Sequence, residues 1–167
     1  MKPTVLFGLQ FTLALLAYAL IAAWYVWPRL SVLPRALALQ PLLWVHAFRF
    51  VGGTILAPGS VGAGVPDDFQ KMIGYGDIAT AALALLALVA LRLRWSLAIA
   101  LTWLVLGVGA VDTVNAIVQS TRDDVFVRTL GFNWVIVTAY VPALLVSSVL
   151  ILVELLRRPG TEAAEPR

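Results

Sequence analysis

The sequence contains no cysteine, a single histidine and few charged residues. Without cysteine the chain can form no disulfide, no thiolate metal site and no thiol nucleophile. Charged residues make up 13% of its 167 positions, against about 25% in an average globular chain. With 61% hydrophobic residues and a mean hydropathy of +0.93, this scarcity of charge excludes a soluble enzyme, a disordered chain and a secreted disulfide scaffold.

Five segments are apolar enough to cross a membrane, for which a helix needs about 20 mostly apolar residues. They cover about 4–27, 36–57, 70–91, 95–118 and 133–156, and short connections rich in proline, glycine and charge separate them. The sequence therefore predicts an all-α, polytopic membrane helix bundle. It forms one domain over 1–157, followed by a disordered cytoplasmic tail over 158–167.

The first segment contains Ala17-Tyr18-Ala19, which has the small-x-small form of a signal cleavage site. Its apolar run of about 20 residues is longer than the 7–15 of a signal peptide, so we expect a retained helix.

The distribution of Lys and Arg predicts the orientation of the bundle. On the N-terminal side lie four of the 12: Lys2, Lys71, Arg122 and Arg128. On the opposite side lie seven, namely Arg29, Arg35, Arg92, Arg94, Arg157, Arg158 and Arg167, while Arg49 falls within a span. Cytoplasmic loops carry the excess of positive charge, so we expect the N-terminus outside the membrane and the C-terminus inside. Because these charges are scattered between apolar runs, the expected partner is the lipid bilayer and not nucleic acid.

Polar side chains from four different spans fall at one depth. With a rise of 1.5 Å per residue, Arg49 lies about 4 Å outward of its span centre, Asp77 about 5 Å, Tyr140 about 7 Å and Asp112 about 8 Å. A charge at such depth is costly and normally faces the bundle interior, where it has a partner. We therefore predict a polar layer in the outer half of the bundle.

Helical spacing adds neighbours to this layer. His46 precedes Arg49 by three residues, and Asn115 follows Asp112 by three, so each pair is expected on one helix face. Gly74, Gly76 and Gly109 are expected to let other helices approach closely. In the last span, polar residues recur every seven positions and predict a stripe that faces the other helices: Asn133, Tyr140, Ser147 and Glu154.

The layer holds one positive and two negative charges, which favours a protonated aspartate or a bound cation. We expect a pocket with Arg49, Asp77 and Asp112 at its core and His46, Asn115 and Tyr140 as its lining. Such a pocket would bind or transport a small polar or anionic ligand, with Arg49 holding an anion and an aspartate carrying a proton. Five spans are few for a carrier acting alone, so transport would require a homodimer.

Two alternatives to ligand binding are compatible with the same residues. In a structural or assembly protein, an Arg49–Asp77 pair would lock helix packing, with Asp112 held by Asn115 or by water. A membrane redox or lipid-modifying enzyme would need a visible chromophore or turnover. One histidine cannot supply two haem ligands, and Asp77, Asp112 and His46 lack a diagnostic metal-binding spacing, so we assign neither catalytic nor metal-binding residues.

Several stretches carry a resemblance to a known group of proteins. They are His46-Ala47-Phe48-Arg49-Phe50-Val51-Gly52, Gly74-Tyr75-Gly76-Asp77, Asp112-Thr113-Val114-Asn115 and the run from Trp134 through Tyr140-Val141-Pro142 to Leu145. In these stretches the chain resembles a family of small bacterial multi-pass integral membrane proteins with no assigned reaction. The resemblance implies a location in the bacterial inner membrane. Members carry a histidine near the position of Ser148, which this chain lacks. A weaker similarity to DoxX-type proteins concerns size and the polar helix ends.

Overall fold

The computed structural model describes all residues except 63, 124, 126–127, 129 and 158–167. The predicted tail over 158–167 therefore lies outside the described residues. The described part is all-helical and contains no strand. Its elements in chain order are α1 (Pro3–Ile21), η1 (Ala22–Val26), α2 (Trp27–Leu30), α3 (Arg35–Ala47), η2 (Phe48–Leu56), α4 (Asp67–Arg92), α5 (Ala98–Arg122), α6 (Asn133–Val135), η4 (Ile136–Tyr140) and α7 (Val141–Leu156).

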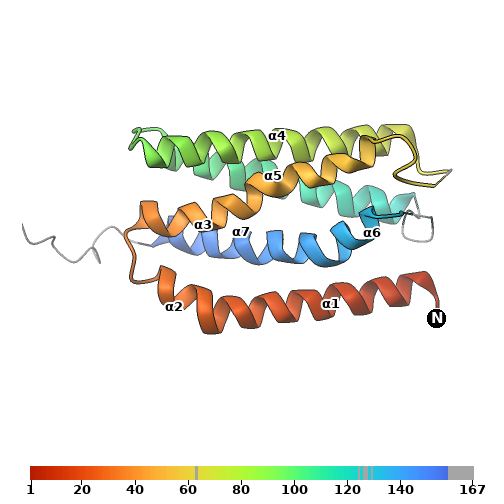
Figure 1. The fold of residues 1–167 in the computed structure, drawn as a ribbon, viewed down its shortest axis with the longest axis horizontal. Helices are drawn as coiled ribbons and strands as arrows, with labels where there is room; N and C mark the ends of the chain where they lie inside the picture. Colours follow the sequence, from red (N-terminus) through yellow and green to blue (C-terminus); the bar gives the residue numbers. More distant parts are fainter. Residues whose placement is uncertain (63, 124, 126–127, 129, 158–167) are drawn as a thin grey trace, which may run out of the picture.

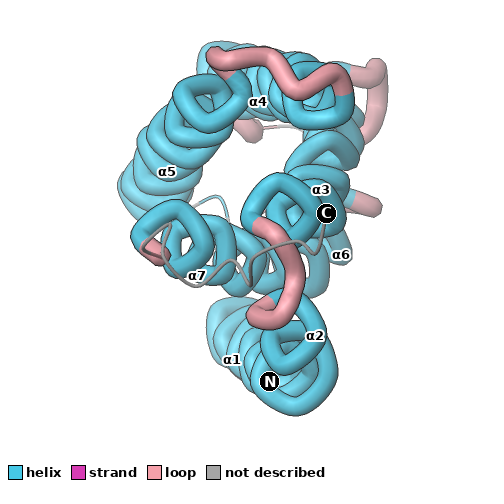
Figure 2. The backbone as a smooth tube through the Cα atoms, turned by 90° about the vertical axis from the view of Figure 1, so that its left-hand side faces the viewer, coloured by secondary structure: helices cyan, strands magenta, loops and turns pink. Residues whose placement is uncertain are grey.

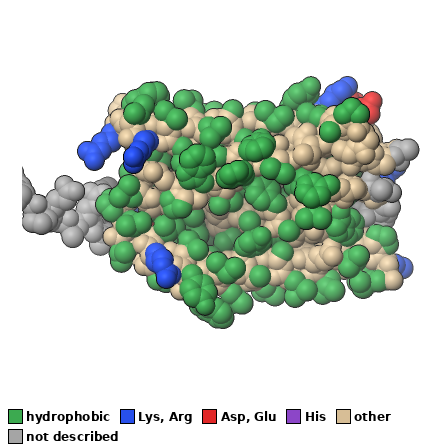
Figure 3. Space-filling model, viewed as in Figure 1, with side chains coloured by type: hydrophobic (Ala, Val, Ile, Leu, Met, Phe, Trp, Pro, Cys, Tyr) green, Lys and Arg blue, Asp and Glu red, His purple; other side chains and the backbone are tan. Residues whose placement is uncertain are grey.

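Four helical runs of the described chain are long and apolar enough to cross a membrane. They cover Pro3–Leu30, Asp67–Arg92, Ala98–Arg122 and Asn133–Leu156, close to four of the predicted spans. Hydrophobic side chains cover the middle of the face seen in Figure 3, whereas charged side chains gather at its two ends. This distribution is typical of a protein whose central belt lies in a bilayer.

The segment 36–57, predicted as one continuous helix, is corrected by the structure to two elements. An α-helix covers Arg35–Ala47, and a 3-10 helix covers Phe48–Leu56. The second half contains Gly52 and Gly53 beside β-branched residues, all of which favour the α-helix weakly. Arg49 is thereby carried on the narrower 3-10 helix.

The long elements lie side by side along the long axis of the bundle and alternate in direction (Figure 1). Figure 2 shows α3, α4, α5 and α7 around a common centre, with α1 outside this ring and against α7. Consistent with that position, α1 has no buried residue between Pro3 and Ile21. The four inner helices therefore enclose the interior of the bundle, and α1 adds to one side of it.

Two π-helical segments interrupt the first and the last long helical runs of the chain. η1 is followed by Pro28 at the start of α2, and η4 is followed by Pro142 at the start of α7. Proline has no backbone N–H and its ring clashes with the carbonyl four residues earlier, so a widened turn before it relieves both problems. η4 ends at Tyr140, which places this widened turn beside the predicted polar layer.

The apolar core consists of two clusters. The larger joins α3, α4, α5 and α7 and includes Leu39, Leu43, Val105 and Ile151, together with small side chains such as Ala84 and Ala87 that allow close helix packing. The smaller lies toward the opposite end of the bundle and consists of Ile55, Val65, Phe69, Val125 and Leu130.

Candidate functional site

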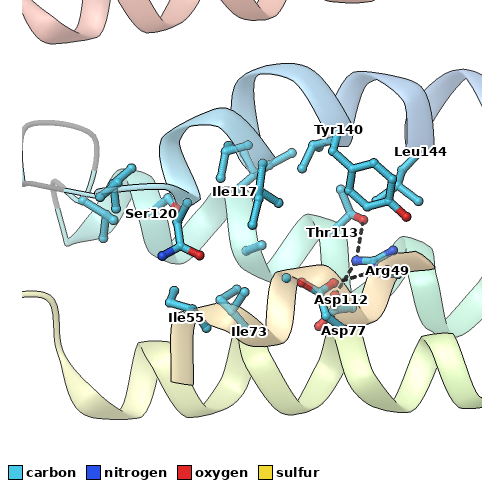
Figure 4. Close-up of a pocket in the computed structure, with 18 of the residues that line it drawn as sticks. Arg49, Ile55, Ile73, Asp77, Asp112, Thr113, Ile117, Ser120, Tyr140 and Leu144 are labelled. Atoms are coloured by element: carbon cyan, nitrogen blue, oxygen red, sulfur yellow. Dashed lines mark hydrogen bonds and ion pairs between the residues drawn. The ribbon is translucent and has the colours of Figure 1, made fainter. Parts of the chain in front are cut away.

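The Arg49 side chain joins carboxylates from two neighbouring helices. Its Nε donates to Asp77 Oδ1 on α4 at 2.5 Å, and its Nη2 donates to Asp112 Oδ2 on α5. Nη2 also donates to Thr113 Oγ1 at 3.1 Å, and Nη1 donates to the Gly109 carbonyl at 3.3 Å. Figure 4 shows Arg49 between these partners. The predicted Arg49–Asp77 pair is confirmed. Asp112 pairs with Arg49 as well, in place of the expected Asn115.

Three glycines make room for this charged cluster. A β-carbon at residue 52 would collide with the Asp77 carboxylate, and one at residue 76 would collide with the Asp112 carboxylate. A β-carbon at residue 109 would lie 3.2 Å from Nη1 of Arg49. Three helices therefore approach each other through glycine at the level where the charges meet, as the sequence predicted for Gly76 and Gly109.

The polar stripe predicted for the last span is confirmed by its contacts with the segment 31–60. The Tyr140 hydroxyl donates to the Val45 carbonyl, and Ser147 Oγ donates to the Leu42 carbonyl at 3.0 Å. Asn133 Nδ2 donates to the Ser60 carbonyl at 3.2 Å. Glu154 pairs at 3.3 Å with Arg157, which donates to the Ser31 and Leu33 carbonyls. The stripe, together with Arg157, thus connects α6, η4 and α7 to the segment 31–60.

A cavity of about 310 Å³ adjoins the charged cluster. Its polar end is lined by Arg49, Asp77, Asp112, Thr113 and Tyr140, so the structure brings together four of the six predicted site residues. Away from this end the lining is mostly apolar and includes Ile73, Ile117 and Ile136. Figure 4 shows Ile55, Ile73 and Ile117 spread along the cavity from the end occupied by Arg49.

His46 is buried but is not among the residues that line the cavity. It is 1% exposed, and neither ring nitrogen has a hydrogen-bond partner among the described residues. A β-carbon at residue 109 would lie 4.0 Å from its Nδ1, which places the imidazole against α5. The predicted lining role of His46 is thus corrected to a buried position behind the cavity wall.

Asn115 is exposed on the outside of α5 and does not reach the cavity. The inward face of this helix runs through Gly109, Thr113, Ala116 and Ser120. Asp112 lies at one edge of that face. The step of three residues from Asp112 to Asn115 turns the helix about 60° less than a full turn, which moves Asn115 off the face. The three-residue spacing does place Asp112 and Asn115 near each other on the helix surface, but Asn115 lies outside the face that points into the bundle.

Two contributors to the site were not predicted, Gly52 and Thr113. Thr113 follows Gly109 by four residues, and its hydroxyl donates back to the Gly109 carbonyl at 2.8 Å. This i, i+4 relation was the available signal for Thr113. No pattern in the sequence distinguishes Gly52 from Gly53, since only the contact with Asp77 makes one of them necessary.

The described residues contain no group of three or more His, Asp or Glu side chains that could hold a metal ion. Asp77 and Asp112 each give one oxygen to Arg49, which leaves two carboxylates with reduced capacity for a ligand. The arrangement can accept hydrogen bonds at its polar end and can contact apolar groups beyond it.

The chain belongs to the family described as "Domain of unknown function (DUF8737)", whose model matches residues 6–156. The comparisons with curated proteins and with solved structures give no match.

Proposed function

We propose that this protein binds a small molecule inside a membrane-embedded helix bundle, with Arg49, Asp77 and Asp112 at the polar end of the binding cavity. The observation that carries this proposal is the cavity of about 310 Å³ directly against the three charged groups. Ligand cavities are usually apolar with a few convergent polar groups, and this composition is present here.

A five-span topology fits the dimensions of the structure. The 13 residues of α3 and the 9 of η2 give about 20 Å and about 18 Å of length, which together exceed the roughly 30 Å of hydrocarbon. The second segment therefore serves as the fifth crossing. We place the bundle N-out, C-in in a bacterial inner membrane, and the excess of arginine at the end that carries Arg29, Arg35, Arg92 and Arg94 supports this orientation.

A packing lock is the second candidate function, because the cluster is so completely paired. Protein interiors are closely packed, and a charged cluster that serves only to hold helices together should be packed in the same way. The open volume beside Arg49 favours ligand binding over this alternative. If the protein also transports the ligand across the membrane in a proton-coupled way, an aspartate of the cluster would accept the proton.

A homodimer is favoured by the lipid-facing side of α5. Asn115 is exposed there, with no hydrogen bond to its side chain among the described residues. An amide in hydrocarbon gains from a partner, and two Asn115 amides related by a two-fold axis can donate to and accept from each other. Gly107 lies two turns away with no atom within 4 Å of where its β-carbon would be, so it leaves space for a neighbouring helix.

Native mass spectrometry of the detergent-purified protein tests the binding proposal, and an absorption spectrum of the same sample tests the redox alternative. We expect a stoichiometric extra mass on the wild type and on Arg92→Gln, whose side chain is exposed at the bundle end. The same mass should be absent from Ala116→Phe, which fills the cavity without changing a charge. An extra mass that Ala116→Phe retains would contradict the proposal, and a coloured wild type would favour the redox alternative.

A further inference from the structure

The polar and apolar ends of the cavity together define a class of ligand. We infer that the cavity binds a single-chain amphiphile whose head is a positively charged hydrogen-bond donor, such as a primary alkylammonium. This inference rests on the proposed binding function and specifies its ligand.

The head end of the cavity offers acceptors in place of donors. Four of the five N–H groups of Arg49 are directed to Asp77, Asp112, Thr113 and the Gly109 carbonyl, which leaves little capacity to hold an anion. The Arg49 side chain is 5% exposed, whereas those of Asp77 and Asp112 remain 13% and 11% exposed. A ligand entering the cavity therefore meets carboxylate oxygen more readily than guanidinium.

The charge of the cluster favours the same class of head. One guanidinium and two carboxylates leave one uncompensated negative charge in a region of low dielectric constant. A cation neutralises that charge, and an anionic head would add a second. The anionic ligand suggested by Arg49 alone is for this reason the less favourable choice.

The remaining lining requires an apolar tail. Phe7 and Phe11 of α1 line the cavity from one side, and Ile73 of α4, Ile117 of α5 and Ile136 of η4 line it from others. The polar side chains at the far end are those of Ser120 and Asn133, and the Asn133 amide is already engaged with Thr54 and Ser60. A hydrophilic ligand would leave its own polar groups unpaired along these walls.

The size of the cavity limits the tail to one short chain. Its volume of about 310 Å³ lies at the lower end of the range of about 300–1,000 Å³ for small-molecule sites. A phospholipid with two long acyl chains does not fit into this volume, whereas one short chain with a small head does.

A matched set of ligands separates the contributions of head and tail. Decylammonium, decanol and decanoate share one chain and differ in head charge, and methylammonium supplies the head without the tail. Binding is measured by native mass spectrometry of the full chain in nanodiscs, as ligand is titrated. The variants are Asp112→Asn, which removes one charge at nearly constant shape, and Ala116→Phe, which fills the cavity. Val114→Phe adds the same ring at a residue that is 59% exposed on the outside of α5 and serves as the control.

We expect decylammonium to bind the wild type and Val114→Phe at least about tenfold more tightly than decanoate, decanol or methylammonium. Asp112→Asn should reduce this preference by about tenfold, and Ala116→Phe should abolish binding. Equal or tighter binding of decanoate or decanol that Ala116→Phe removes would overturn the ligand class but leave the binding function standing. Tight methylammonium binding would overturn the requirement for a tail. Absence of any binding that depends on residue 116 would overturn the inference, and the mass of a co-purified ligand would still decide the binding function separately.

Discussion

The Asp77 carboxylate occupies the space that a β-carbon at residue 52 would need. This contact between α4 and η2 lies directly beside the ion pair of Asp77 with Arg49, so backbone spacing and charge pairing depend on each other here. Asp112 and Gly76 repeat the relationship between α5 and α4. The charged cluster is therefore accommodated by glycine on two of its sides.

Gly52→Ala should consequently destabilise the protein. The added methyl must displace a carboxylate that is held by Arg49, and overpacking of this kind costs about 1–3 kcal/mol. Thermal unfolding in detergent measures the effect. Gly8→Ala in α1 is the control, since its methyl meets no atom within 4 Å and alanine favours a helix by about 1 kcal/mol. Equal unfolding temperatures for the two variants would contradict the collision inferred from the structure.

Removal of Arg49 should cost more stability than removal of either aspartate. Arg49→Gln leaves two buried carboxylates facing each other, and loss of one partner from a buried pair costs about 3–5 kcal/mol. Asp77→Asn leaves Arg49 paired with Asp112, so we expect a smaller loss.

The double variant Arg49→Gln, Asp77→Asn measures the coupling between the two residues. Its free energy of unfolding should be higher, by about 0.5–3 kcal/mol, than the sum of the two single-variant losses predicts. Equal losses for the two single variants, with additive behaviour of the double, would show that the cluster does not act as a bridged unit.

The sequence was sufficient to predict four of the long helical runs, the meeting of Arg49, Asp77 and Asp112 at one level and the polar stripe. Each of these depends on local quantities, namely the length of an apolar run, the rise per residue and a seven-residue repeat. The change from α3 to η2 could not be predicted, because the weak helix formers around Gly52 and Gly53 show where an α-helix is weakened but not which geometry replaces it. Asn115 was misplaced for a related reason. The spacing of three residues fixed its angle to Asp112, but only the neighbouring helices determine where the inward face ends.

The proposed homodimer can be tested because the chain has no cysteine. We expect Val111→Cys, on the exposed side of α5 between Gly107 and Asn115, to form an intermolecular disulfide in oxidised membranes. Leu16→Cys on α1 is the control, since both residues are more than half exposed and lie within about 2 Å of the centres of their helical runs. Replacement of Asn115 by leucine in the Val111→Cys protein should reduce the crosslinked fraction. If both cysteines crosslink equally, contact is random and the α5 interface is disproved.

Adjacent serines in α7 allow a test of the polar stripe. Ser147 Oγ donates to the Leu42 carbonyl of α3, whereas Ser148 Oγ donates to the Leu144 carbonyl within its own helix at 2.8 Å. Ser147→Ala should therefore lower the free energy of unfolding by about 0.6 kcal/mol, the average for interhelical hydrogen bonds in membranes. Ser148→Ala removes an identical hydroxyl but no contact between helices, so its effect should be smaller. The difference between the two unfolding free energies is the measured quantity. A larger loss for Ser148→Ala would show that the stripe does not hold α7 to α3.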